Sequence, residues 1–330
     1  MIIVFMLQQE SNYSGETIEN VFDDSFFGSD IWELFSSNPD TEPRTVCGIE
    51  ASENGKPVLL PVAKYDIVFV KLGSPISGSI CGSSGLPPSR IPADAETLLN
   101  CDWSLWFRLA KASSKFGNPS AFCTHISESL LETFTVLIPP LEYKLICEQV
   151  NHSQGHDGHL ISVACSNWSI KLVFPQSQSQ PDTSQEEDTC ALIGYALTPK
   201  ENGNLVKKPM CACSGDEILA ELLWQLNIPF DDIVEKVTVN SRLLPLGLSP
   251  LLTRSDEDRP SFIPANTTNI ALIGQYVEID GESTLSLEYG VRSAELAVQR
   301  LLNLDISLPK VKRSTVVARY GNCPRKDYIQ

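Results

Sequence analysis

The stretch NIALIGQYVEI, residues 269–279, is a short, nearly continuous apolar run that stops abruptly at Gly274. Such a run is typical of a strand that is covered on both faces, as in a parallel sheet. The stretch YDIVFVKLGS, residues 65–74, has the same form and ends at Gly73 and Ser74. Two similar strands that lie far apart in the chain predict an α/β domain that is interrupted by an insert.

The segment between these strands has a different pattern. Between Glu132 and Leu197 the runs TFTVLI, HLISVACS, WSIKLVF and CALIGYAL are separated by polar stretches, which predicts a mostly antiparallel sheet. A hairpin is predicted at Asn54-Gly55, because this dipeptide favours a tight turn between strands. The loop GSPISGSICGSSGLPP is predicted to be irregular, since glycine, serine and proline dominate it.

Three helices are predicted. The first runs from about Ala93 to Lys115, and the second begins at a capping box of Ser214 and Glu217 and ends at Pro229. The third runs from about Leu287 to Leu302. Its predicted apolar face consists of Val291, Ala294, Val298, Leu301 and Leu302.

Charge and cysteine usage narrow the class of protein. The chain has 41 acidic and 25 basic side chains, so its surface repels phosphate backbones and no nucleic acid is expected as a partner. The N-terminal run MIIVFMLQQE is too short to cross a bilayer, has no basic leader, and is interpreted as a strand. Ten scattered cysteines in a chain of this length favour reduced thiols and a cytoplasmic location.

The edge at Gly274 is the first candidate site. A strand, a glycine and a helix that begins near Ser286 place backbone donors and a positive helix end at the carboxyl edge of the sheet. A glycine there also permits close approach of a ligand to the backbone. An ordinary strand, loop and helix would give the same spacing, so the pattern alone leaves both interpretations open.

Several further segments resemble one protein family. They are FGNP, ETFTVLI, GNLVKKPM, CSGDEILAELL, DRPSFIPANTTNIALIGQYVEI and LEYGVRSAELAV, in this order. Together with residues 65–74 they resemble the oleate hydratases, also called the myosin-cross-reactive antigen family, from roughly Tyr65 to Leu302. The resemblance implies an enzyme containing flavin adenine dinucleotide (FAD) that adds water to the cis double bond of a long-chain unsaturated fatty acid. FAD is not consumed in that reaction.

The resemblance also implies a set of cofactor-binding residues and a division into domains. Residues 1–115 and 256–330 would form a partial, Rossmann-like FAD-binding domain, and residues 116–255 a β-rich substrate-domain insert. The partner implied is the fatty acid. Whether the chain also pairs with a second copy in a homodimer is left open. The residues expected beside FAD are Gly73, Ser74, Gly274, Gln275, Tyr276, Glu278 and Ser286.

The chain departs from the family at the first nucleotide-binding unit. A strand followed by G-x-G-x-x-G is not found, and the family's acidic proton donor lies upstream of the matched segments, so we expect a truncated chain without an assigned catalytic acid or base. Glu278 and Glu288 are interpreted as helix-end or solvated carboxylates. The alternatives left open are a non-catalytic remnant that binds a fatty acid or a protein, and a flavin oxidoreductase.

Three remaining features are interpreted conservatively. His152, His156, His159 and Asp157 fit no established zinc spacing, so no metal is predicted. Cys211 and Cys213 precede a helix whose positive end can lower a thiol pKa, but a buried, inert pair is the preferred interpretation. A basic C-terminal tail is either a solvated terminus or a peripheral contact with anionic lipid. It carries Lys310, Lys312, Arg313, Arg319, Arg325 and Lys326.

Overall fold

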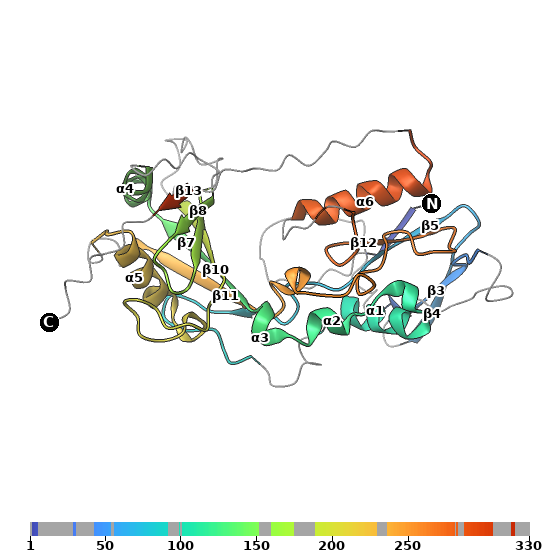
Figure 1. Cartoon of the computed structure of the whole chain (residues 1–330), viewed down its shortest axis with the longest axis horizontal. Helices are drawn as coiled ribbons and strands as arrows, with labels where there is room; N and C mark the ends of the chain where they lie inside the picture. Colours follow the sequence, from blue (N-terminus) through green and yellow to red (C-terminus); the bar gives the residue numbers. More distant parts are fainter. Residues whose placement is uncertain are drawn as a thin grey trace. The chain divides into compact units, whose positions relative to one another are not determined.

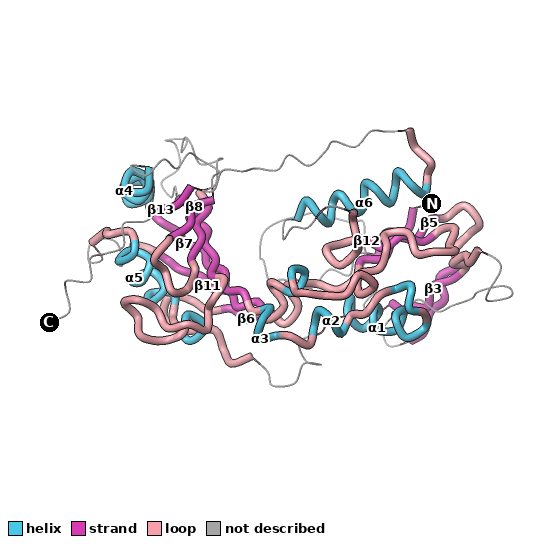
Figure 2. Tube along the Cα trace, viewed as in Figure 1, coloured by secondary structure: helices cyan, strands magenta, loops and turns pink. Residues whose placement is uncertain are grey.

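A computed structural model gives the fold of the chain (Figures 1 and 2). The residues it describes are 2–5, 29–30, 43–53, 56–91, 99, 101–151, 160–174, 189–229, 236–280, 282, 287–305 and 318–320. The chain forms two compact units. Unit 1 comprises Met1–Ser77, Asp94–Glu128 and Leu248–Lys310, and unit 2 comprises Gly78–Ala93, Ser129–Gly247 and Val311–Gln330.

Unit 1 contains a three-stranded parallel sheet. Its strand order is β1 (Ile2–Phe5), β5 (Ile67–Lys71) and β12 (Ile270–Ile273), and both pairings are parallel. The central residues of β5 and all four residues of β12 are buried. The three strands predicted from apolar runs are therefore confirmed, and the burial of β5 and β12 explains why their runs are continuous rather than alternating.

A second small sheet in unit 1 is antiparallel. It joins β2 (Ser29–Asp30), β3 (Gly48–Glu53) and β4 (Lys56–Pro61) in that order. The pairing of Glu53 with Lys56 confirms the predicted hairpin, whose turn residues lie outside the described part of the chain.

The helices of unit 1 correct two sequence predictions. The helix α1 spans Cys101–Ala112, and residue 99 is not helical, so the predicted start at Ala93 is wrong for the described residues. The helix α6 spans Leu287–Leu301, close to the predicted range, but Val291 is 60% exposed and does not belong to its packed face. The buried side chains of α6 are Tyr289, Ser293 and Ala297, which follow one another at helical spacing. Short helical turns at η2 (Ser114–Phe116), α2 (Ser120–Cys123), α3 (Ile126–Ser129) and η6 (Ser249–Leu251) complete the helices of this region.

Unit 2 is built on a seven-stranded sheet. The predicted strands are confirmed, and their pairings are antiparallel, but the loop predicted to be irregular also contributes a two-residue edge strand, β6. The helix α4 (Pro140–Asn151) was not predicted. The sheet order is β13 (Ala318–Tyr320), β8 (Leu160–Val163), β9 (Ile170–Val173), β10 (Cys190–Ala196), β7 (Leu131–Ile138), β11 (Thr238–Leu244) and β6 (Ile80–Cys81), with β13 parallel to β8.

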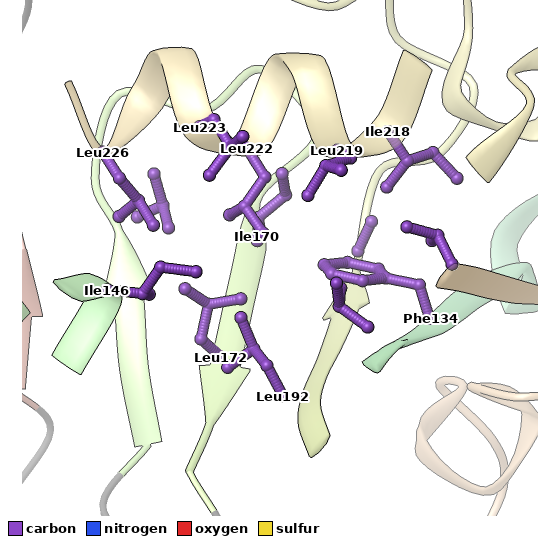
Figure 3. Close-up of a cluster of buried hydrophobic side chains, with 14 of the residues drawn as sticks. Phe134, Ile146, Ile170, Leu172, Leu192, Ile218, Leu219, Leu222, Leu223 and Leu226 are labelled. Atoms are coloured by element: carbon purple, nitrogen blue, oxygen red, sulfur yellow. The ribbon is translucent and has the colours of Figure 1, made fainter. Parts of the chain in front are cut away.

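One face of this sheet carries the core of unit 2 (Figure 3). Leucine and isoleucine side chains of α5 (Gly215–Gln225) lie over Phe134, Ile170, Leu172 and Leu192 of the strands. The predicted capping box is confirmed. The helix ends before Pro229, however, because Asn227 adopts a left-handed conformation with φ of 57°. The turn η4 (Met210–Ala212) precedes the helix and adds Met210 to the core.

Candidate functional site

The two glycine-terminated strands end side by side in unit 1. Ile273 pairs with Lys71 in the parallel ladder, and the Leu72 N–H donates to the Ile273 carbonyl at 3.2 Å. The segments that begin at Gly73 and Gly274 therefore leave the same edge of the sheet. Both glycines have positive φ, 52° and 109°, a region of backbone conformation that side chains other than glycine rarely adopt.

Gly274 is held directly against the closing helix. Its N–H donates to the Ser293 hydroxyl at 2.9 Å, and that hydroxyl donates to the Gly290 carbonyl at 2.6 Å. A Cβ added at Gly290 would lie 3.9 Å from the Gly274 Cα. The sheet edge and the first half of α6 are thus in contact.

The surroundings of the two glycines differ. A Cβ added at Gly274 would lie no closer than 3.5 Å to another heavy atom, so only the backbone conformation requires glycine there. A Cβ at Gly73 would lie 3.0 Å from the Tyr276 ring and 3.2 Å from the Trp103 ring. The backbone at Gly73 is therefore covered by two aromatic side chains, while the backbone at Gly274 retains more room.

An aromatic cluster fills the interior beneath these segments. The Tyr276 ring is fully buried, and its centroid lies 5.0 Å from that of Trp103 and 5.4 Å from those of Trp106 and Phe122. The Tyr276 hydroxyl shares a hydrogen bond of 2.7 Å with the Ser249 hydroxyl. Burial raises the pKa of Tyr276 above its ordinary value, because the phenolate would have to be desolvated. The side chain of Tyr276 is therefore a neutral packing element in this structure.

Ser74 belongs to the same arrangement. It is buried, and its carbonyl accepts a hydrogen bond from the Trp103 indole at 3.2 Å, while the same indole also contacts the Ser77 hydroxyl at 3.1 Å. These contacts fix the turn after β5. They show that the segment GSPIS forms an ordered turn, which its composition does not predict.

The other predicted site residues have diverse environments. The Glu278 carboxylate pairs with the Arg254 guanidinium at 3.0 Å, and its N–H donates to the Pro260 carbonyl at 2.8 Å. Gln275 is half-buried, and Glu288 is exposed. Ser286, the predicted N-cap of α6, lies outside the described residues.

Arg259 and Tyr289 form a buried clamp that sequence reasoning missed. The Arg259 guanidinium donates to the Tyr289 hydroxyl at 3.1 Å, to the Val277 carbonyl at 3.4 Å and to the Pro250 carbonyl. The Tyr289 hydroxyl donates to the Val277 carbonyl at 2.9 Å and lies 3.2 Å from the Ile279 N–H, which donates to it. The clamp ties residues 277–279 to the first turns of α6.

The charge of Arg259 is unusual for a buried group. Its residue is 4% exposed, and desolvation lowers the pKa of the guanidinium from its ordinary value. The guanidinium lies over the rings of Phe122 and Tyr289, at 5.9 Å and 5.6 Å, which stabilises the cation. The sequence around Arg259, DRPSF, does not indicate that this arginine is buried. Only the fold shows its burial.

The remaining sequence candidates belong to unit 2 or lie outside the described residues. The four residues of the histidine cluster are outside them, and so are the tail residues, apart from the backbone of Arg319 in β13. Among the described histidine, cysteine, aspartate and glutamate residues, no group of three is arranged to hold a metal ion. Burial raises the pKa of Cys211, and raises that of Cys213 to about 12, so the preferred interpretation of inert thiols agrees with their surroundings. No described helix is long and apolar enough to span a membrane.

Known proteins with related sequences agree with the resemblance. The chain is 28% identical over 274 residues to an oleate hydratase of Streptococcus pyogenes serotype M49 (strain NZ131), which covers 79% of this chain and 45% of that protein. It is 25% identical over 290 residues to a linoleate hydratase of Lactiplantibacillus plantarum. That match covers 81% of this chain and 49% of the linoleate hydratase. The chain thus spans about half the length of the curated relatives it matches. A model of the MCRA family matches residues 36–299, and the chain belongs to this family.

Proposed function

We propose that the chain carries the fatty-acid-binding and flavin-facing parts of a fatty acid hydratase, a hydro-lyase that adds water to the cis double bond of a long-chain unsaturated fatty acid. The observation that carries this proposal is the family match over residues 36–299, which includes both glycine-terminated strands. The names of the two relatives, an oleate hydratase and a linoleate hydratase, support the substrate class.

We further propose that FAD binds at the sheet edge of unit 1, in a partial FAD-binding domain. The positive φ of Gly274 supports this assignment, together with the absence of a tight contact, since the nearest heavy atom to a Cβ there would be the Lys71 Cγ at 3.5 Å. The Gly274 N–H is already bonded to Ser293, and the Tyr276 and Glu278 side chains are bonded elsewhere. Gly274 and Gln275 would therefore contact the flavin mainly through van der Waals packing. The backbone of Tyr276 would lie beside the flavin.

The chain's own residues would act in this site by positioning. Ser293 fixes Gly274 on α6, and Arg259 with Tyr289 fixes the carbonyl of Val277. When bound, FAD would supply a planar ring that is not consumed by the overall hydration.

Titration of the purified chain with FAD and with oleate, read separately, tests the proposal. We expect saturable flavin binding with a shifted visible spectrum, saturable oleate binding, and weakened flavin binding in Gly274→Ala. Gly85→Ala serves as the control, because a Cβ at Gly85 would meet no atom within 4 Å. Oleate binding without flavin binding would instead support a non-catalytic fatty-acid-binding remnant, and binding of neither would overturn the proposal.

A further inference from the structure

The last residue of β5, Lys71, lies at the carboxyl edge of the parallel sheet in unit 1. The three residues before it are buried, and the half-buried lysine ends the apolar run. In the parallel ladder Lys71 pairs with Ile273, which is the last residue of β12. The lysine therefore stands beside the two segments that begin at Gly73 and Gly274.

The Lys71 side chain lies on the face of the sheet that α6 covers. Side chains alternate along a strand, so Lys71 shares its face with Phe69, and residues paired across the ladder also share a face. Phe69 and Ile273 pack in one cluster with Ala294 and Val298 of α6. The lysine thus extends this packed face to the edge of the sheet.

The aliphatic part of Lys71 lies against Gly274. A Cβ added at Gly274 would have the Lys71 Cγ as its nearest heavy atom, at 3.5 Å. The Gly274 N–H donates to the Ser293 hydroxyl of α6, so the lysine, the glycine and the helix meet at one place. A lysine packs its methylene groups on a surface while its charged end extends beyond them. The ammonium is therefore within reach of a ligand that lies on Gly274.

The charge of the chain makes a cation at this edge significant. The net charge is -16, so an anionic cofactor such as FAD is repelled unless the site supplies positive charge locally. Two arginines near the edge hold internal partners, since Arg254 pairs with Glu278 and Arg259 donates to Tyr289. Lys71 places a third cation directly beside Gly274, with an ammonium that has three donors on a flexible stem.

We propose that Lys71 is a cofactor-binding residue, whose ammonium donates to the carbonyl oxygens on the pyrimidine side of the flavin ring while its stem packs on Gly274. The inference rests on the proposed function, because it requires a flavin at this edge. It adds a charged donor to a site whose glycines offer van der Waals packing. A cation on that side of the ring also stabilises the negative charge that the ring gains on reduction.

The test titrates the full chain with FAD and with riboflavin, which has the same ring and no phosphate. Lys71→Met keeps a stem of similar length and should weaken both ligands by about tenfold or more, because a charge-assisted hydrogen bond is lost. Lys71→Arg should restore part of the affinity. Lys64→Met is the matched control, because Lys64 is an exposed lysine before the other end of β5, and both affinities should stay unchanged.

A second readout separates the charge of Lys71 from its packing. The same titrations are repeated with flavin that has been reduced by dithionite in the absence of oxygen. Lys71→Met should weaken the binding of reduced flavin more than that of oxidised flavin, since the reduced ring carries more negative charge. A loss of packing alone would weaken the two forms equally.

Each outcome decides the assignment, provided that circular dichroism shows each variant to be folded. Equal flavin affinities in wild type and Lys71→Met would overturn the inference while the proposed function stands. A loss for FAD with riboflavin unchanged would place the ammonium on a phosphate and overturn the contact with the ring. Equal losses for oxidised and reduced flavin would reduce Lys71 to a packing residue. If the wild type binds no flavin, the proposed flavin site and the inference both fall.

Discussion

The hydroxyl of Ser293 accepts a hydrogen bond from the N–H of Gly274, and this bond joins the residue after β12 to the middle of α6. Ser293→Ala leaves that N–H without its partner in a part-buried position, so we expect a loss of about 1–3 kcal/mol in the free energy of unfolding. Urea denaturation measures it. The exposed Glu295, on the same helix, provides the control variant Glu295→Ala, which should change stability by less than about 0.5 kcal/mol. Equal losses in both variants would contradict the assigned contact.

Two variants at Tyr276 distinguish the contribution of ring packing to stability from that of the hydrogen bond. Tyr276→Phe removes only the bond to Ser249 and should cost about 1 kcal/mol, whereas Tyr276→Ala also removes a ring from a cluster with Trp103, Trp106 and Phe122 and should cost about 3–5 kcal/mol. Thermal or urea unfolding of both variants gives the comparison. A nearly neutral Tyr276→Ala would show that the ring does not fill the interior as described.

The two edge glycines should respond differently to the same change. Gly73→Ala introduces both a left-handed alanine and a contact of 3.0 Å with the Tyr276 ring, while Gly274→Ala introduces backbone strain without a close contact. We expect Gly73→Ala to be the more destabilising, with the backbone part costing about 1–2 kcal/mol. The reverse order in denaturant midpoints would refute the described packing.

The buried carboxyl group of Glu132 should make the stability of unit 2 depend on pH. It is fully buried in β7, neither carboxyl oxygen has a hydrogen-bond partner among the described residues, and desolvation raises its pKa from 4.5 to about 8. The folded state keeps this proton up to about pH 8, whereas the unfolded state releases it near pH 4.5. The stability of unit 2 should therefore fall as pH rises through this window, by up to about 1.4 kcal/mol per pH unit.

Glu132→Gln removes this titration, so its unfolding free energy should depend less on pH and exceed that of the wild type near pH 8. Glu142→Gln is the matched control. The hydrogen bond from Lys236 lowers the pKa of Glu142, so its contribution is lost as pH falls, and the variant should retain the slope that Glu132 causes. Identical pH profiles for wild type and Glu132→Gln would rule out the buried, protonated carboxyl.

The sequence predicts those parts of the fold that depend on local patterns. The apolar runs of β5 and β12, the alternation of β7 and the capping box at Ser214 each follow from residues that are neighbours in the chain. Helix α4 was not predicted because the residues around its start, PPLEYK, suggest a turn after a strand. The exposure of Val291 could not be foreseen either, since the fully buried residues of α6 for which burial is described are Tyr289, Ser293 and Ala297, and two of these are small.

The sequence predicts where the candidate site lies in the fold, but not how its side chains are arranged. Two glycines after buried strands indicate the shared sheet edge, but whether the Tyr276 ring points toward a ligand or into the interior depends on Trp103 and Phe122, which come from distant parts of the chain. The burial of Arg259 similarly depends on the hydroxyl of Tyr289. The register of β10, β7 and β11 places Tyr195, Thr133 and Arg242 in one row of the unit 2 sheet, and no single stretch of sequence contains that information.

The most direct test of the central claim is equilibrium titration of the purified chain with FAD, followed by visible absorbance and flavin fluorescence. Our account predicts saturable binding near one flavin per chain, with altered absorbance and with weaker binding in Gly274→Ala than in Gly85→Ala. A flavin spectrum that stays that of free FAD at every protein concentration would contradict it.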